Sequence, residues 1–155
     1  MTLAQPTTWE RHLPTIAQLA LTGYIEAALW AETVITPSAS EDEDRSWSDL
    51  GYDRDSLAPA TLKRMVADVT AFMARFEGDV SRIEGDRYDP RVWGQAGHDL
   101  WLTRNRHGVG FWDGDWPEPF AAQATAYAHT LGETDLYADS DGVIWQSGAE
   151  CDGAA

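Results

Sequence analysis

Apolar residues along the first half of the chain predict two long helices. Over residues 15–34, apolar or small residues recur at spacings of three and four, which is the period of an amphipathic helix. A clearer stripe consists of Leu62, Met65, Val66, Val69, Phe72, Met73 and Phe76. Proline favours the first turn of a helix and glycine its end, so we expect the second helix to run from Pro59 to Gly78.

Helical signals return twice in the second half. The pair Asp89-Pro90 is a good helix start and predicts a short helix over residues 91–96 that ends at Gly97. A last helix is expected over residues 117–131, with Gly132 as its stop.

Two other segments change to a period of two, which is typical of β-strands. Residues 100–103 and 109–112 enclose a polar loop and predict a first hairpin. Residues 136–138 and 143–145 enclose a turn that ends in Asp-Gly, a strong hairpin signal. Helices and hairpins in separate stretches favour an α+β fold, in which helices pack on a small antiparallel sheet of about four strands.

A length of 155 residues suits one hydrophobic core. We expect a single domain over residues 1–148, with an acidic loop at about 36–56 after the first helix. Residues 149–155 are expected to form a flexible tail.

Charge is concentrated in two acidic blocks. The chain has 26 acids against 11 Lys and Arg, a net charge of -15. Residues 38–55 hold seven acids and two arginines, and residues 113–155 hold nine acids and neither Lys nor Arg. This charge disfavours direct binding to nucleic acid or to anionic membranes, because both attract cations.

Membrane insertion, disulfides and metal sites are not expected. No apolar run approaches the roughly 18 residues of a membrane span and no signal peptide is visible, which favours a soluble cytoplasmic protein. Cys151 is the one cysteine. Residues 139–142 resemble part of a calcium loop, but their glycine is fourth rather than sixth and no Glu stands at position twelve. We therefore predict no metal and no cofactor.

The predicted first hairpin carries the residues best suited to catalysis. His98 or His107 would act as general base beside Asp99, with Arg104 and Arg106 holding an oxyanion or phosphate. The spacing supplies no nucleophile, and the same residues fit a strand and its turn. A small hydrolase or nuclease is therefore an alternative hypothesis.

The tryptophans divide by their neighbours. Those within apolar patterns are predicted to lie in the core, namely Trp30, Trp93, Trp101 and Trp145. Trp112 and Trp116 flank Asp113 and Asp115, and one or both are predicted to lie at the rim of an acidic face. A rigid aromatic beside carboxylates is a good anchor for a basic protein partner.

The acidic blocks suggest mimicry of a nucleic acid. Carboxylates a few ångströms apart imitate duplex DNA, which carries a charge about every 1.7 Å of its axis. The competing explanation is a solvated face in an acid-biased proteome. The residues predicted to bind a partner are Glu41, Asp42, Glu43, Asp44, Asp49, Asp53, Asp55, Trp112, Asp113, Asp115, Trp116, Glu118, Glu133, Asp135, Asp139 and Asp141.

Residues 97–113 read Gly-His-Asp-Leu-Trp-Leu-Thr-Arg-Asn-Arg-His-Gly-Val-Gly-Phe-Trp-Asp. They resemble the central signature of a family of small acidic proteins encoded by bacteriophages and other mobile elements, mostly without an assigned function. The similarity extends to residues 24–30 and 132–137. The departures are Leu100 for Phe, Arg106 for Gly and Val109 for Ala. Glycine suits a turn with positive φ, so with Arg106 in its place we expect the turn at this position to be shaped differently.

The resemblance implies a phage or prophage origin and a place in the host cytoplasm. Small acidic phage proteins are often inhibitors of host systems, including restriction and CRISPR enzymes. The leading hypothesis is therefore an inhibitor of a basic, nucleic-acid-handling host protein. The alternatives are the small enzyme above and a structural accessory that dimerises through exposed aromatics.

Overall fold

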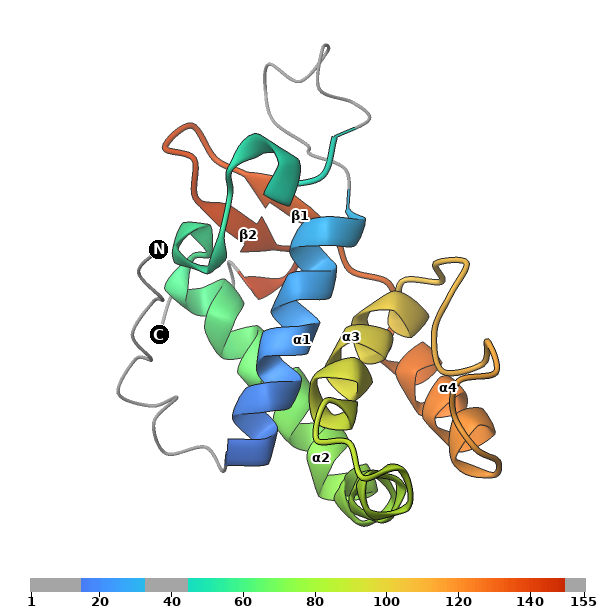
Figure 1. Cartoon of the computed structure of the whole chain (residues 1–155). Coiled ribbons are helices and arrows are strands. Elements are labelled where there is room, and N and C mark those ends of the chain that lie inside the picture. The colour runs from blue at the N-terminus through green and yellow to red at the C-terminus, as the bar shows by residue number, and fades with distance from the viewer. Residues whose placement is uncertain (1–14, 33–44, 150–155) are drawn as a thin grey trace.

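The computed structural model describes residues 15–32 and 45–149 (Figure 1). Its helices are α1 (Thr15–Ala31), η3 (Ser48–Leu50), η4 (Arg54–Ser56), α2 (Pro59–Arg87), α3 (Val92–Arg104) and α4 (Phe120–Leu131). Its strands are β1 (Leu136–Ala138) and β2 (Ile144–Gln146). The α+β class is confirmed. The prediction of four strands in two hairpins is wrong, because the described residues form one two-stranded antiparallel sheet.

The backbones of α1 and α3 touch at two glycines. A Cβ atom on Gly23 would lie 1.9 Å from the carbonyl oxygen of Gly94, and one on Gly97 would lie 1.8 Å from that of Ala20. Only glycine fits such a crossing. The prediction that Gly97 ends a short helix over residues 91–96 is wrong, because the contact with α1 keeps Gly97 inside a longer helix.

Residues 100–103 belong to α3 and not to a strand. All four are buried, since α3 contacts α1, α2 and α4 and lies between α1 and α4 in Figure 1. A helix covered on several sides shows no alternation, so a short apolar run does not tell helix from strand. Residues 109–112 form no strand either, and the backbone N–H of Phe111 donates to Oγ1 of Thr103.

The second predicted helix is present but longer than expected. The buried stripe of α2 continues past Gly78 to Val80 and Ile83, and the helix ends before Tyr88, which has a left-handed φ of 54°. Gly78 is exposed with no atom near its Cβ position, so it does not interrupt the helix. The last helix begins three residues later than predicted, at Phe120, and stops at Gly132 as expected.

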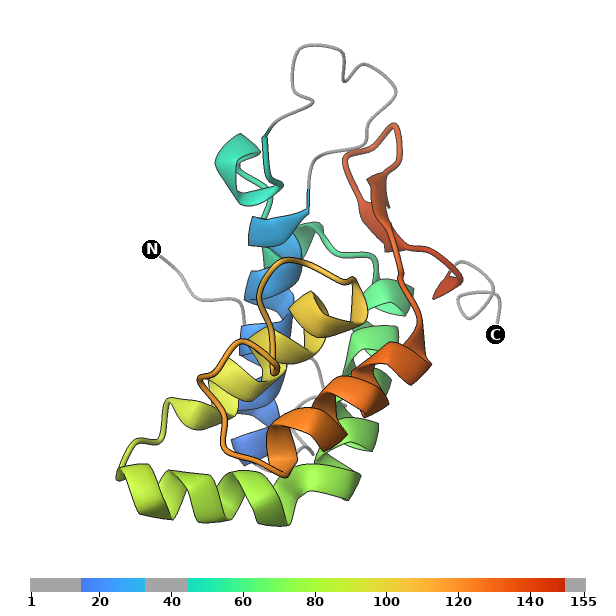
Figure 2. The same ribbon diagram turned by 90° about the vertical axis from the view of Figure 1, so that its right-hand side faces the viewer.

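The second predicted hairpin is confirmed. Leu136 pairs with Gln146 and Ala138 with Ile144. The hairpin is attached to the start of α2, because Oγ1 of Thr61 donates to the carbonyl of Ile144 and accepts from the N–H of Gln146. In Figures 1 and 2, the hairpin and η3 lie at the end of the molecule where α1 ends.

An aromatic cluster joins α2, α4 and the loop before α4. Its rings have centroids 5.0 to 6.0 Å apart and belong to Phe72, Phe76, Phe111, Trp116, Phe120 and Tyr127. Several predictions fall outside the described residues, namely the end of the first helix at 33–34, the acidic loop as far as residue 44, Cys151 and the tail from residue 150.

Candidate functional site

Three adjoining grooves share the indole of Trp30, near the end of α1. The first, of about 630 Å³, runs between α1 and α3. The second, of about 490 Å³, lies between the end of α1 and the loop after α3. The third, of about 360 Å³, separates α1 from η3 and η4. Together these grooves are called the Trp30 site.

Trp30 is 61% exposed, so its predicted place in the core is wrong. The apolar stripe of α1 is wider than its close contact with α3, and Leu19 of the same stripe is 42% exposed. The ring centroid of Trp30 lies 5.9 Å from that of His98. A large aromatic surface therefore faces solvent where the grooves meet.

Acids from both acidic blocks line the Trp30 site. Asp113 and Asp115 line the first groove, Asp49 lines the second and Asp53 lines the third. These four predicted partner-binding residues come from segments far apart in the sequence. The structure brings them to grooves that share one tryptophan. The number of charges in each acidic block does not reveal this placement.

Two further acids at this site were missed by the sequence prediction. Glu26 lines the first and third grooves, and Glu32 lines the second. Glu26 is four residues before Trp30 and therefore on the same face of the helix. That spacing was the available signal for Glu26, but both Glu26 and Glu32 lie outside the two acidic blocks on which the prediction was based.

Asp99 lines the first groove although it is only 7% exposed. Its Oδ2 accepts a hydrogen bond of 2.6 Å from the indole N–H of Trp116, and its Oδ1 lies 3.7 Å from Nδ1 of His98. Trp116 is 4% exposed, which contradicts its predicted role as an exposed anchor. Its indole instead fills the core and orients the Asp99 carboxylate.

Trp112 is exposed as predicted, at 54%, but it is not among the residues that line these three grooves. Trp93 and Trp101 are buried as predicted, whereas Trp145 is only half-buried.

His107 belongs to the second groove. Its Nε2 lies 2.8 Å from Oε1 of Glu32, and the same oxygen accepts a hydrogen bond of 2.9 Å from the indole N–H of Trp101. The first and second grooves share Leu102 and Val109, but His98 and His107 line different ones.

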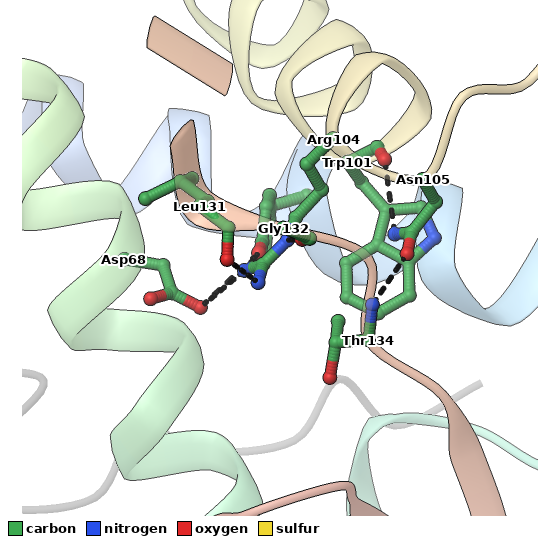
Figure 3. A network of polar contacts seen from close by, with 8 residues as sticks. Asp68, Trp101, Arg104, Asn105, Leu131, Gly132 and Thr134 are labelled. Atoms are coloured by element: carbon green, nitrogen blue, oxygen red, sulfur yellow. Dashed lines mark hydrogen bonds and ion pairs between the residues drawn. The ribbon is translucent and has the colours of Figure 1, made fainter. Parts of the chain in front are cut away.

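Arg104 is buried in a closed polar network (Figure 3). Its Nη1 donates to Oδ2 of Asp68 and to the hydroxyl of Tyr24, both at 3.0 Å. Its Nε and Nη2 donate to the carbonyls of Gly132 and Leu131 at the end of α4. We call these residues the Arg104 cluster. Burial raises the pKa of the Tyr24 phenol far above its ordinary value, and the negative charge of Asp68 raises it further.

The predicted catalytic set is therefore not assembled at one site. Arg104 holds α1, α2, α3 and the end of α4 together, and its guanidinium partners include neither His98 nor His107. Each of these histidines has its own carboxylate neighbour. Arg106 is exposed in the turn after α3. It has a φ of 57°, so the left-handed conformation that glycine would suit is kept, contrary to the expected change of shape.

The remaining predicted acids lie elsewhere. Asp55, Glu133, Asp135 and Asp141 are exposed, and Glu118 accepts from the N–H of Ala122. Asp139 accepts hydrogen bonds from the Trp145 indole and from backbone N–H groups of its turn, and these bonds lower its pKa. None of these six lines the three grooves. Glu41, Asp42, Glu43 and Asp44 lie outside the described residues.

Comparison of the chain with protein-family models, curated proteins and solved structures found no match. No described helix is both long and apolar enough to cross a membrane. In the described ranges, no three His, Cys, Asp or Glu side chains gather as a metal site would require.

Proposed function

We propose that this protein binds and inhibits a basic, nucleic-acid-handling protein of a bacterial host, by occupying the cationic surface that nucleic acid would use. The observation that carries this proposal is the Trp30 site. There, Asp49 and Asp53 of one acidic block and Asp113 and Asp115 of the other line grooves that share an exposed tryptophan.

The chemistry of the site suits such a partner. Carboxylates around a groove attract a basic protein and accelerate its association, while a desolvated tryptophan supplies much of the affinity. The grooves also contain Arg91 and Arg54, but the guanidinium of Arg91 is bonded to the carboxylate of Asp89. The acids therefore dominate the charge of this surface.

The whole-chain charge of -15 supports a protein partner over a nucleic acid. The resemblance of residues 97–113 to small acidic phage proteins supports a host target such as a nuclease or a restriction or CRISPR component. DNA mimicry is the simplest mode of inhibition, because one basic surface would then bind either ligand.

The test is affinity capture from bacterial lysate on three immobilised proteins. These are the wild type, a groove variant that combines Glu26→Gln with Asp115→Asn, and a control that combines Glu77→Gln with Asp86→Asn. Each pair removes two charges from exposed acids, but the control acids lie on α2 and outside the grooves. Captured proteins are identified by mass spectrometry, and duplex DNA is then added as a competitor.

We expect the wild type and the control to capture the same nucleic-acid-binding protein, the groove variant to capture less, and DNA to release it. The proposal is wrong if no nucleic-acid-binding protein is identified, if the groove variant captures as much as the control, or if DNA does not compete.

A further inference from the structure

We infer that the first groove of the Trp30 site is an arginine-binding subsite, which takes the guanidinium of one arginine side chain of the partner. This inference rests on the proposed function and names the chemical group that the site recognises.

The first reason is the acceptor capacity of Asp99. This carboxylate is 7% exposed and accepts one hydrogen bond from the described residues, from the Trp116 indole to Oδ2. A carboxylate has about four acceptor positions, and a buried charge is costly unless it is paired. Nδ1 of His98, at 3.7 Å from Oδ1, lies beyond hydrogen-bond distance. Asp99 thus retains free acceptor capacity in the lining of a groove.

The second reason is the exposed aromatic surface in the lining of the same groove. Trp30 and Asp99 line the same groove, and Trp30 is 61% exposed. A cation above an indole is attracted by the negative face of the ring, and tryptophan is the best of the aromatic residues for this contact. The groove therefore offers a cation both an aromatic face and a carboxylate. The imidazole of His98 neighbours both, with its ring centroid 5.9 Å from that of Trp30 and its Nδ1 3.7 Å from Oδ1 of Asp99.

The third reason is the charge at the rim. Glu26, Asp113 and Asp115 line this groove with exposed side chains. Arg91 is the arginine in the lining, and its Nε and Nη2 donate to Asp89 at 3.0 Å. Those hydrogen bonds hold the pKa of Asp89 below its ordinary value. Arg91 is thus already engaged, and the groove keeps an excess of negative charge.

Arginine fits this arrangement better than lysine. Its guanidinium is planar, stacks on an indole and forms parallel hydrogen bonds to a carboxylate, whereas the ammonium of lysine is a compact, strongly hydrated charge. The volume of about 630 Å³ accommodates such a side chain with part of its backbone.

The inference is tested by NMR titration of the ¹⁵N-labelled full chain, read at the indole N–H signals of its tryptophans. The probes are Nα-acetyl-arginine amide, the lysine analogue, and the citrulline analogue, which has the shape of arginine without its charge. The signals of Trp30 and Trp112 are assigned from Trp30→Phe and Trp112→Phe.

We expect the arginine probe to shift the Trp30 signal saturably, the lysine probe to bind at least about threefold more weakly, and the citrulline probe to cause no shift. Asp99→Asn and Glu26→Gln should each weaken the arginine probe by about tenfold or less, and Glu77→Gln should not change it. The amide introduced by Asp99→Asn still offers an acceptor oxygen to Trp116, and Glu26→Gln remains informative if the other variant unfolds.

The subsite is wrong if arginine and lysine bind equally, if Trp112 shifts as much as Trp30, if nothing saturates, or if every folded groove variant retains wild-type affinity. Where the arginine probe fails but the groove variant still reduces capture of a nucleic-acid-binding protein, the proposed function stands without this subsite. Saturable arginine binding with no captured nucleic-acid-binding protein would support the subsite and contradict the proposed function.

Discussion

The Arg104 cluster and the Trp30 site both contain residues of the stretch 97–113, yet they differ in how completely their buried charged groups are hydrogen-bonded. In the cluster, all three guanidinium nitrogens of Arg104 have partners. In the site, Asp99 keeps acceptor capacity in a groove that is also lined by Trp30, which is 61% exposed. A buried charge with complete partners holds a fold together, whereas one with acceptors to spare beside a groove is available to a ligand.

Removal of the Arg104 charge is expected to have the largest effect on stability, and it tests whether the Arg104 cluster and the Trp30 site differ in their structural role. Arg104→Met keeps most of the side-chain volume but removes the cation that Asp68 and Tyr24 share. Among the described residues, it leaves the partly buried Asp68 carboxylate only the 3.2 Å hydrogen bond from the Tyr24 hydroxyl. We therefore expect the free energy of unfolding to fall by about 3–5 kcal/mol. Urea denaturation measures this change. Trp30→Ala is the control and should change stability by no more than about 0.5 kcal/mol, because its side chain is exposed. Equal losses for the two variants would contradict the division between cluster and site.

The crossing of α1 and α3 supports both regions, and Gly97→Ala tests it. The new Cβ would meet the backbone of Ala20, which cannot yield without moving α1. We expect a loss of about 3 kcal/mol, at the upper end of the overpacking range. The matched control is Gly85→Ala, at an exposed α2 position with open space around it. That variant should gain about 0.5–1 kcal/mol, and a destabilisation equal to that of Gly97→Ala would refute the close crossing.

Alkaline pH should weaken the cluster specifically. The folded state keeps the Tyr24 phenol neutral because burial raises its pKa, whereas the phenol of an unfolded tyrosine ionises at about pH 10. Above that pH the unfolded state binds fewer protons, so stability falls as pH rises. Tyr24→Phe should flatten this dependence in denaturation curves. Tyr127→Phe should flatten it less, since Tyr127 is shifted in the same direction but is only half-buried. An unchanged slope in Tyr24→Phe would contradict the assignment.

The smallest effect concerns the turn between the two regions. Arg106 stands in the left-handed region at a φ of 57°, where a side chain is strained and glycine is not. Arg106→Gly should therefore stabilise the protein by about 0.5–1 kcal/mol in thermal denaturation. A loss of stability would indicate that the Arg106 side chain makes contacts that outweigh this strain.

Local signals in the sequence predicted the parts of the fold that depend on local chemistry. The stripe of α2 and the Asp-Gly turn of the hairpin each point to one structure. The hairpin predicted for residues 100–112 is wrong. The run Leu100 to Thr103 is buried, and a short buried run of this composition fits a central helix as well as a strand. The prediction of Gly97 as a helix stop is wrong because its contact with Ala20 is tertiary.

The site was predictable only in part, for the same reason. Charge counting found Asp49, Asp53, Asp113 and Asp115, and the structure brings them to neighbouring grooves. The exposure of the tryptophans was predicted for Trp112 but not for Trp30 or Trp116, because exposure depends on which part of a stripe a neighbouring helix covers. Trp30 lies in an apolar pattern and is exposed, whereas Trp116 lies among acids and is buried.

The central claim is that the partner binds at Trp30, and two exposed tryptophans offer a matched test of it. The measurement is the dissociation constant of the captured nucleic-acid-binding protein for Trp30→Ala and for Trp112→Ala, at one salt concentration. A central anchor is worth about 2 kcal/mol, so Trp30→Ala should weaken binding by about 30-fold, and Trp112→Ala by less than about twofold. Equal effects of the two substitutions, or a larger effect of Trp112→Ala, would contradict the account.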